Sequence, residues 1–282
     1  MSNLVERARE LCQPLSPIPT GVTAQLPKLN DIRAVLFDVY GTMLISGSGD
    51  VGTATADNNA ASLEEALHCS GFEVHTGTSG VRGIELLDQQ IRAFHKERRS
   101  DGVAYPEVEI RSIWKSVVAE LCDGQSGDIE RMAIEYECRV NPVWPMPDLV
   151  ETLDAIKARG IMLGIVSNAQ FYTPVLLETL LGQSHIATGF RKSACVWSYE
   201  ILEAKPSRHL YELALEELNP SQVLYVGNDM RNDIWPSQEL GCQTALFAGD
   251  RRSLRLREDD ECVANVKPSA VITNLGQIIE II

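Results

Sequence analysis

The 282-residue sequence contains no run of about 18 apolar residues, the length that a helix needs to cross a bilayer. The N-terminal residues include acidic side chains and lack an uninterrupted apolar segment, which argues against a secretory signal. Positive charge is also scarce, since 25 Lys and Arg face 39 Asp and Glu, for a formal net charge of -14. We therefore expect a cytoplasmic protein that binds no nucleic acid or membrane and whose partner is a small molecule.

Cysteine pairs with the spacing of metal or redox motifs are missing as well. We expect reduced, buried thiols rather than disulfides or a metal site. Hydrophobic residues make up 44% and charged residues 23% of the chain, which is typical of a folded globular protein. The seven cysteines are odd in number and never form C-x-x-C: Cys12, Cys69, Cys122, Cys138, Cys195, Cys242 and Cys262.

Residues 1–30 are predicted to form an extension ahead of the folded core. A short helical pattern is followed by a stretch with several prolines, which disfavour regular structure. Residues 34–37 then form a compact apolar run, A-V-L-F, that ends on Asp38 and is followed by Gly41. Such a run is typical of a buried strand of a parallel sheet that leads into a loop.

Residues 46–144 show helical patterns and no clear strand. Residues 46–60 are rich in Gly, Ser, Ala, Thr and Asn, which favours a flexible hinge. The segment S-L-E-E from Ser62 predicts a capping box at the start of a helix. Further helical periodicity runs from Ile84 to Phe94 and from Ile110 to Leu121.

After residue 147, strands and helices alternate along the chain. This alternation predicts right-handed βαβ units and a doubly wound α/β fold with a parallel sheet. Ligands of such sheets bind beyond the carboxyl ends of the strands, so residues just after each strand are the candidates. The expected elements are a helix over 148–159, a strand ending at Ser167 and Asn168, a helix over about 207–218, and strands over 223–227, 244–248 and around Val271.

Several polar residues follow these strands. The carboxylate of Asp38 would point into the crevice, although an aspartate here could also cap the turn. Ser167 and Asn168 can donate hydrogen bonds to a bound anion, but they could equally form an ordinary turn. Lys205, in E-A-K-P-S, could neutralise an anionic substrate or nucleophile, or it could be a surface lysine.

The loop after residues 223–227 holds two acids in the segment G-N-D-M-R-N-D. Asp229 and Asp233 lie four residues apart, hence on one face if a helical turn forms there. Beside Asp38 these carboxylates would repel one another, and a hard divalent cation such as Mg²⁺ would offset that cost. The alternative is that Asp229 caps the following turn while Asp233 is solvated.

Together these segments resemble the haloacid dehalogenase-like superfamily. Four motifs stand in family order: D-V-Y-G-T at Asp38, S-N at Ser167, the Lys205 segment and the G-N-D-M-R-N-D loop. The resemblance covers residues 34–45 and about 145–250. One large subclass carries a helical cap between the first two motifs. The resemblance therefore implies a Rossmann-like catalytic core over 31–45 and 145–282, with a helical cap inserted over 46–144. We expect this cap to be mobile, with hinges at the Gly- and Ser-rich segment and near residues 142–147.

The resemblance also implies a hydrolase in which Asp38 attacks phosphorus or carbon and forms an ester that water hydrolyses. In the phosphatases, the Mg²⁺ ligands match Asp38, the backbone carbonyl of Tyr40 and one acid of the last motif. Asp229 is the first choice for that acid and Asp233 the second.

Other positions of the motifs match groups that bind the substrate. Thr42 and Ser167, with the adjacent Asn168, would contact the transferring group, while Lys205 balances charge. The expected substrate is a small anionic metabolite, above all a phosphorylated one.

Tyr40 departs from the phosphatase pattern, which has at this position a second aspartate that protonates the leaving group. A tyrosine with a pKa of about 10 is a poor donor at neutral pH. The dehalogenases carry tyrosine here, because a halide needs no proton. They are metal-free, however, whereas this chain keeps Asp229 and Asp233. A phosphatase is thus the preferred interpretation, and a 2-haloacid dehalogenase or a weakly active ligand- or protein-binding homologue are the alternatives.

Overall fold

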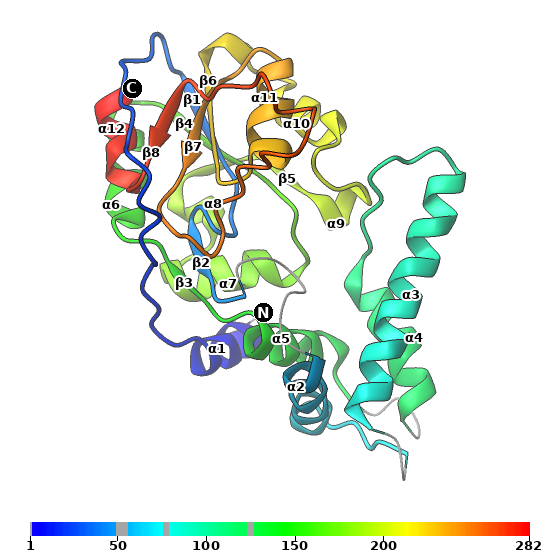
Figure 1. The fold of residues 1–282 in the computed structure, drawn as a ribbon. Coiled ribbons are helices and arrows are strands. Elements are labelled where there is room, and N and C mark those ends of the chain that lie inside the picture. The colour runs from blue at the N-terminus through cyan, green and yellow to red at the C-terminus, as the bar shows by residue number, and fades with distance from the viewer. Residues whose placement is uncertain (1, 49–55, 76–78, 123–126) are drawn as a thin grey trace.

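The computed structural model describes residues 2–48, 56–75, 79–122 and 127–282 (Figure 1). A six-stranded sheet has the order β5-β4-β1-β6-β7-β8, and every neighbouring pair in it is parallel. The predicted α/β fold with a parallel sheet is therefore confirmed. The strands are β1 (Ala34–Phe37), β4 (Met162–Ser167), β5 (Phe190–Trp197), β6 (Val223–Gly227), β7 (Gln243–Phe247) and β8 (Ala270–Ile272).

Helices cover both faces of this sheet. Successive side chains of a strand point to opposite faces, so alternate residues of β1 pack against different helices. In β1, Val35 and Phe37 pack in the same apolar cluster as residues of α6, α7 and α12, whereas Ala34 and Leu36 pack in a second cluster with α10. Burial on both faces explains why β1 is apolar at every position. The helices that flank the sheet are α6 (Leu149–Ala158), α7 (Tyr172–Leu181), α10 (Arg208–Leu215), α11 (Trp235–Glu239) and α12 (Ile278–Ile281).

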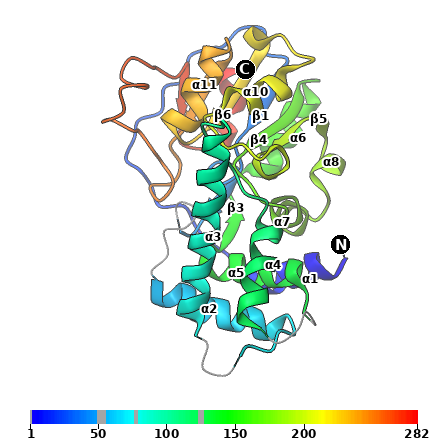
Figure 2. The same ribbon diagram turned by 90° about the vertical axis from the view of Figure 1, so that its right-hand side faces the viewer.

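Between β2 (Leu44–Ser46) and β3 (Val143–Pro145) in sequence the described residues form four helices, which make a layer beside the sheet (Figures 1 and 2). At the base of this layer β2 and β3 form a short antiparallel pair. The turn between α3 and α4 reaches the core, where Glu107 N donates to Leu202 O and Ala204 N donates to Tyr105 O. The helices are α2 (Ala56–Cys69), α3 (Gly80–Ser100), α4 (Ile110–Leu121) and α5 (Ile129–Val140).

The start of α2 corrects one expectation. The helix begins at Ala56, so Ser62 lies inside it and the predicted capping box at Ser62 is wrong. The alanines among residues 56–61 have high helix propensity, and buried Ala60 continues the apolar face of Leu63 and Leu67. Of the expected hinge over 46–60, residues 49–55 lie outside the described residues, and residues 56–60 are helical.

The cysteines largely match the expectation of free, buried thiols. All seven cysteines are free, and Cys12, Cys122, Cys138 and Cys242 are buried. The expectation of burial is wrong for Cys262, which is exposed in the loop between β7 and β8. No helix within the described ranges is long and apolar enough to cross a membrane.

The N-terminal residues are packed against the rest of the protein. Helix α1 (Ser2–Leu11) contacts both α5 and α7, and Ala8 is fully buried in this contact. Further along, Gln25 pairs with Val271 of β8 through two backbone hydrogen bonds, and Thr20 Oγ1 donates to Ala248 O at 2.7 Å. Residues before β1 thus connect the helical layer to the far edge of the sheet.

Glu135 of α5 is the ionic centre of the contact with α1. Its side chain is fully buried, and it forms ion pairs with Arg7 of α1 and Arg139 of α5. Arg7 Nη2 also donates to Glu135 Oε2 at 3.0 Å. One buried carboxylate therefore satisfies two guanidinium groups from different helices.

We expect Glu135→Ala to lower the free energy of unfolding by about 3 kcal/mol, because it leaves two arginines without their shared partner. Urea denaturation measures this change. Glu130→Ala is the matched control in the same helix, since the Glu130 side chain is 45% exposed and its pair with Arg111 contributes less than about 1 kcal/mol. Equal losses in the two variants would contradict a special role for Glu135.

Candidate active site

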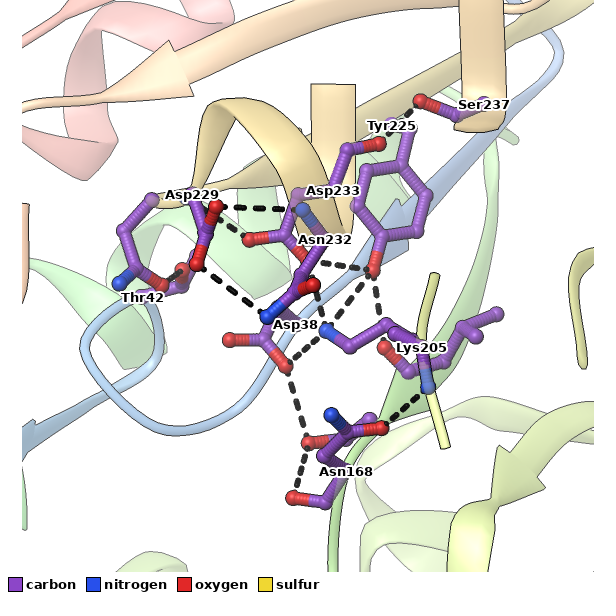
Figure 3. A network of polar contacts seen from close by, with 12 residues as sticks. Asp38, Thr42, Asn168, Lys205, Tyr225, Asp229, Asn232, Asp233 and Ser237 are labelled. Carbon is purple, nitrogen blue, oxygen red and sulfur yellow. Dashed lines mark hydrogen bonds and ion pairs between the residues drawn. The ribbon is translucent and has the colours of Figure 1, made fainter. Parts of the chain in front are cut away.

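Residues from four separate segments meet at the carboxyl ends of the central strands (Figure 3). Lys205 Nζ lies 2.7 Å from Asp38 Oδ1 and 2.6 Å from Asp233 Oδ1. Ser167 Oγ donates to Asp38 Oδ1 at 3.0 Å. Lys205 is thus not a surface lysine and Asp233 is not solvated, because they are 6% and 1% exposed.

The backbone around this cluster fixes the side chains. Gly41, with φ +80°, turns the chain after β1, and a Cβ at this position would lie 2.4 Å from Ser253 Cβ. Only glycine meets both demands without strain. Asn168 Oδ1 accepts from the backbone N of Lys205 at 2.7 Å, which ties the lysine segment to the end of β4.

The charges of the cluster depend on one another. Burial alone would lower the pKa of Lys205, but Asp233 and Asp38 raise it above its ordinary value. Burial raises the pKa of Asp233 to about 7, and Asp38 and Asp229 act in the same direction while Lys205 opposes them. Lys205 is therefore cationic at neutral pH and stabilises the carboxylates that surround it.

Asp229 occupies the capping position that the sequence left open as an alternative. Its Oδ1 accepts from the backbone N of Arg231 at 2.8 Å and of Asn232 at 3.1 Å, at the start of a single π-helical turn over Met230–Ile234. Arg257 Nη2 donates to Asp229 Oδ2 at 2.6 Å. The two acids are also joined directly, because Asp229 N donates to Asp233 Oδ2 at 2.9 Å.

Thr42 and Asn228 hold the loops after β1 and β6 together. Thr42 is fully buried, and its Oγ1 donates to Asn228 Oδ1 at 2.9 Å. Asn228 Nδ2 in turn donates to Ser253 O at 2.6 Å, in the loop between β7 and β8. The hydroxyl of Thr42 is thus engaged within the protein.

Tyr40 lines one pocket with Asp38, and its hydroxyl contacts α7. Its hydroxyl lies 2.9 Å from Thr173 Oγ1. Burial raises the pKa of Tyr40 well above 10, and nearby Glu137 acts in the same direction. Tyr40 is therefore an even poorer proton donor than an ordinary tyrosine.

A pocket of about 500 Å³ opens onto these groups. Sequence reasoning did not single out five of its residues: Ser46 of β2, Asn228 and Asn232 in and beside the turn after β6, and Ser253 and Arg255 in the loop between β7 and β8. Asn228 and Asn232 belong to the G-N-D-M-R-N-D segment, of which only the two acids were proposed as ligands, whereas Ser46, Ser253 and Arg255 belong to no motif and reach the pocket through the fold. The pocket is lined by Asp38, Tyr40, Ser46, Asn168, Lys205, Asn228, Asp229, Asn232, Asp233, Ser253 and Arg255.

The oxygen atoms of this pocket suit a hard cation in their chemistry. Asp38 Oδ2 accepts no hydrogen bond from any residue within the described part of the chain, and the amide of Asn228 and the carboxylate of Asp229 line the same pocket. No group of three His, Cys, Asp or Glu in the described ranges has the arrangement of a metal site. Mg²⁺ needs less than that, since one or two carboxylates, water and a substrate phosphate usually complete its coordination.

The chain is similar in sequence to known hydrolases. A family model described as haloacid dehalogenase-like hydrolase matches residues 32–241. The chain is 27% identical over 237 residues to a phosphoglycolate phosphatase of Escherichia coli O157:H7, which covers 77% of this chain and 81% of that protein. It is 28% identical over 229 residues to a phosphoglycolate phosphatase of Shigella boydii, with 76% and 81% covered.

Solved structures share the fold. A 2-haloacid dehalogenase from Pseudomonas syringae pv. Tomato aligns with a TM-score of 0.58 and 17% identity, covering 89% of this chain and 97% of its own. A HAD phosphatase from Thermococcus onnurineus aligns with a TM-score of 0.55 and 16% identity, covering 88% and 96%. At such identities these likenesses describe the architecture and not the substrate.

We expect Lys205→Met to lower the free energy of unfolding by about 3 to 5 kcal/mol at neutral pH, because Asp38 and Asp233 lose their shared buried cation. Thermal or urea denaturation at pH 7 measures the loss. Lys192→Met is the control, since it removes the same charge from an exposed position on β5. A Lys205→Met protein as stable as the wild type would show that other groups balance the two acids.

Proposed function

The chain belongs to the haloacid dehalogenase-like hydrolases, and from this membership and the site we propose that it is a Mg²⁺-dependent phosphatase of small phosphomonoesters. The observation that carries the proposal is the arrangement of Asp38. Its Oδ1 is held by Lys205 and Ser167, while its Oδ2 is left toward a pocket with further carboxylate and amide oxygens. A carboxylate fixed at one oxygen and open at the other is suited to nucleophilic attack.

In this mechanism Asp38 Oδ2 forms a bond to phosphorus as the bond from phosphorus to the leaving oxygen breaks. Ser167, the Asn168 amide and Lys205 donate hydrogen bonds and positive charge to the phosphoryl oxygens. Water then attacks phosphorus, releases inorganic phosphate and restores the Asp38 carboxylate. Mg²⁺, held by Asp38, the carbonyl of Tyr40 and Asp229 or Asp233, would supply positive charge against the phosphate oxygens.

Departure of the leaving group is the demanding part of the first step. Tyr40 is held by Thr173 and has a raised pKa, so it does not replace the aspartate found at this position in phosphatases. The rate of transfer to Asp38 should therefore depend on how stable the leaving oxyanion is by itself.

We propose that α2 to α5 act as a cap over this site. The turn between α3 and α4 contacts residues 202–204, directly ahead of Lys205, so its position controls access to the cluster. Helix α1 contacts both α5 and α7, which would restrain α5 while α3 and α4 move. A closed turn would exclude water from the phosphoryl group until the leaving group departs.

A dehalogenase is the second candidate, because Tyr40 suits a halide leaving group that needs no proton. Asp229 and Asp233 favour the phosphatase, since both line the pocket and add negative charge that a haloacid carboxylate would meet. The acidic composition of the chain also favours a small substrate in the cytoplasm over nucleic acid.

We expect the wild type to release phosphate from p-nitrophenyl phosphate with Mg²⁺ and to release no chloride from chloropropionate. Asp38→Asn should reduce phosphate release by at least ~10³-fold, because the amide is not a nucleophile. Asp154→Asn removes the same charge from an exposed position on α6 and should leave the rate unchanged. Chloride release without metal would replace the phosphatase with the dehalogenase, and no turnover of either compound would favour a binding protein.

Arg257 tests which acid binds the metal. Arg257→Gln removes a cation that donates to Asp229, so it should tighten Mg²⁺ binding roughly tenfold if Asp229 is a ligand. Isothermal titration calorimetry with MgCl₂ alone measures the Kd. Arg251→Gln is the control, because Arg251 is exposed in the same loop. Unchanged affinity in Arg257→Gln would instead favour Asp233.

A further inference from the structure

A second pocket, of about 550 Å³, adjoins the pocket of the nucleophile. The two pockets share Tyr40 and Asn168, so a group attached to a phosphate on Asp38 would extend from one into the other. Glu107, Glu137, Gln170 and Tyr172 also line the second pocket, which we call the leaving-group chamber. It lies where the helical layer meets the core.

Glu107 comes from the turn between α3 and α4. Its Oε1 accepts from the backbone N of Val108 at 2.9 Å and from Gln170 Nε2 at 3.3 Å. Ser198 Oγ donates to its Oε2 at 2.9 Å. All of these partners are neutral, and burial raises the pKa of the Glu107 carboxyl.

Glu137 of α5 has the same kind of surroundings. It is 6% exposed, and its carboxylate accepts from Asn141 Nδ2 at 3.1 Å and from the Tyr172 hydroxyl at 2.9 Å. Burial raises the pKa of Glu137 as well. One half-buried carboxyl group, of Glu107, and one buried carboxyl group, of Glu137, therefore line one chamber and accept hydrogen bonds from neutral donors.

Other buried carboxylates of the protein have cationic partners. Glu135 pairs with Arg7 and Arg139, and Asp233 pairs with Lys205. Among the described residues that line the chamber, none is Lys, Arg or His. Leaving a buried carboxylate without a positive partner is costly, and a cationic ligand would remove that cost.

The nearby arginine of α4 does not supply this charge. Arg111 pairs with Glu109 at 2.6 Å and with Glu130 at 2.9 Å, and its guanidinium stacks on the Phe171 ring at 4.8 Å. It does not line the chamber. The acidic character of the chamber therefore remains uncompensated by the side chains that form it.

We infer that the leaving-group chamber binds a positively charged amino group, so that the substrate is a small phosphomonoester of an amino alcohol. This inference rests on the proposed phosphatase activity and names its substrate class. The phosphate meets Lys205, Ser167 and Asn168, while the ammonium group meets Glu107 and Glu137. A leaving group with a carboxylate, as in phosphoglycolate, would be repelled by the same two acids.

The wild type with Mg²⁺ is tested on four compounds: phosphoethanolamine, glycerol phosphate, phosphoglycolate and p-nitrophenyl phosphate. We expect kcat/KM for phosphoethanolamine to exceed that for glycerol phosphate and for phosphoglycolate by ~10- to 100-fold, the range of a hydrogen bond to a charged group. Equal values for phosphoethanolamine and glycerol phosphate, or a preference for phosphoglycolate, overturn the inference while turnover of p-nitrophenyl phosphate keeps the proposed function. Without turnover of p-nitrophenyl phosphate, both fall.

Charge-neutral variants assign the preference to the chamber. Glu107→Gln and Glu137→Gln should each reduce the ratio of kcat/KM for phosphoethanolamine to that for phosphoglycolate by ~10-fold. Glu97→Gln removes the same charge from an exposed position on α3 and should keep the ratio of the wild type. A ratio unchanged in both chamber variants, or lowered equally by Glu97→Gln, overturns the inference. Circular dichroism verifies that each variant is folded.

Discussion

The buried Lys205 is the group on which the rest of the site depends. Three carboxylates, of Asp38, Asp229 and Asp233, line one pocket at the carboxyl ends of the central strands, where they would otherwise repel one another. Lys205 contacts two of them, and Arg257 contacts the third. Because Asn168 anchors the backbone of Lys205, the position of the cation is fixed before any ligand binds. The ionic balance of the pocket and the position of the Asp38 carboxylate are therefore one feature of the fold.

The central strands and their ends could be predicted because fully buried strands appear in the sequence as short, mostly apolar runs. β1 and β6 are buried at every position and are followed by polar residues, so the sequence indicates where these strands end and where the candidate site lies. β5 was not predicted, since three consecutive residues from Arg191 are exposed and interrupt its pattern. The helix at 56–69 was placed too late, because the S-L-E-E capping-box pattern from Ser62 indicated a start there, whereas Asp57, Asn58 and Asn59 in the true first turn favour a cap or turn in sequence.

The contacts between distant segments could not be predicted in the same way. In the loop between β7 and β8, Ser253 lines the pocket and Arg257 pairs with Asp229, and no periodicity or motif predicts either contact. Glu107 reaches the chamber because the turn between α3 and α4 forms backbone hydrogen bonds with residues 202–204. Such contacts depend on how separate elements pack, so a single sequence shows the residues and not their neighbours.

The pocket of Asp38 suits an anion, whereas the leaving-group chamber suits a cation. Tyr40 lines both. On the side of Asp38, Lys205 and the hydrogen-bond donors suit an anion that gains charge during transfer. In the chamber, half-buried Glu107 and buried Glu137 have no Lys, Arg or His beside them among the described lining residues, so an anionic leaving oxygen would depart toward negative charge. With Tyr40 unable to donate its proton readily, that departure requires compensation from the leaving group. An ammonium group on the same small alcohol would supply positive charge at the chamber side and lower the pKa of the alcohol that forms. Position 40 lacks an aspartate, and the chamber contains two acids. Both features favour the same substrate class, because each makes a cationic leaving group more favourable than a neutral or anionic one.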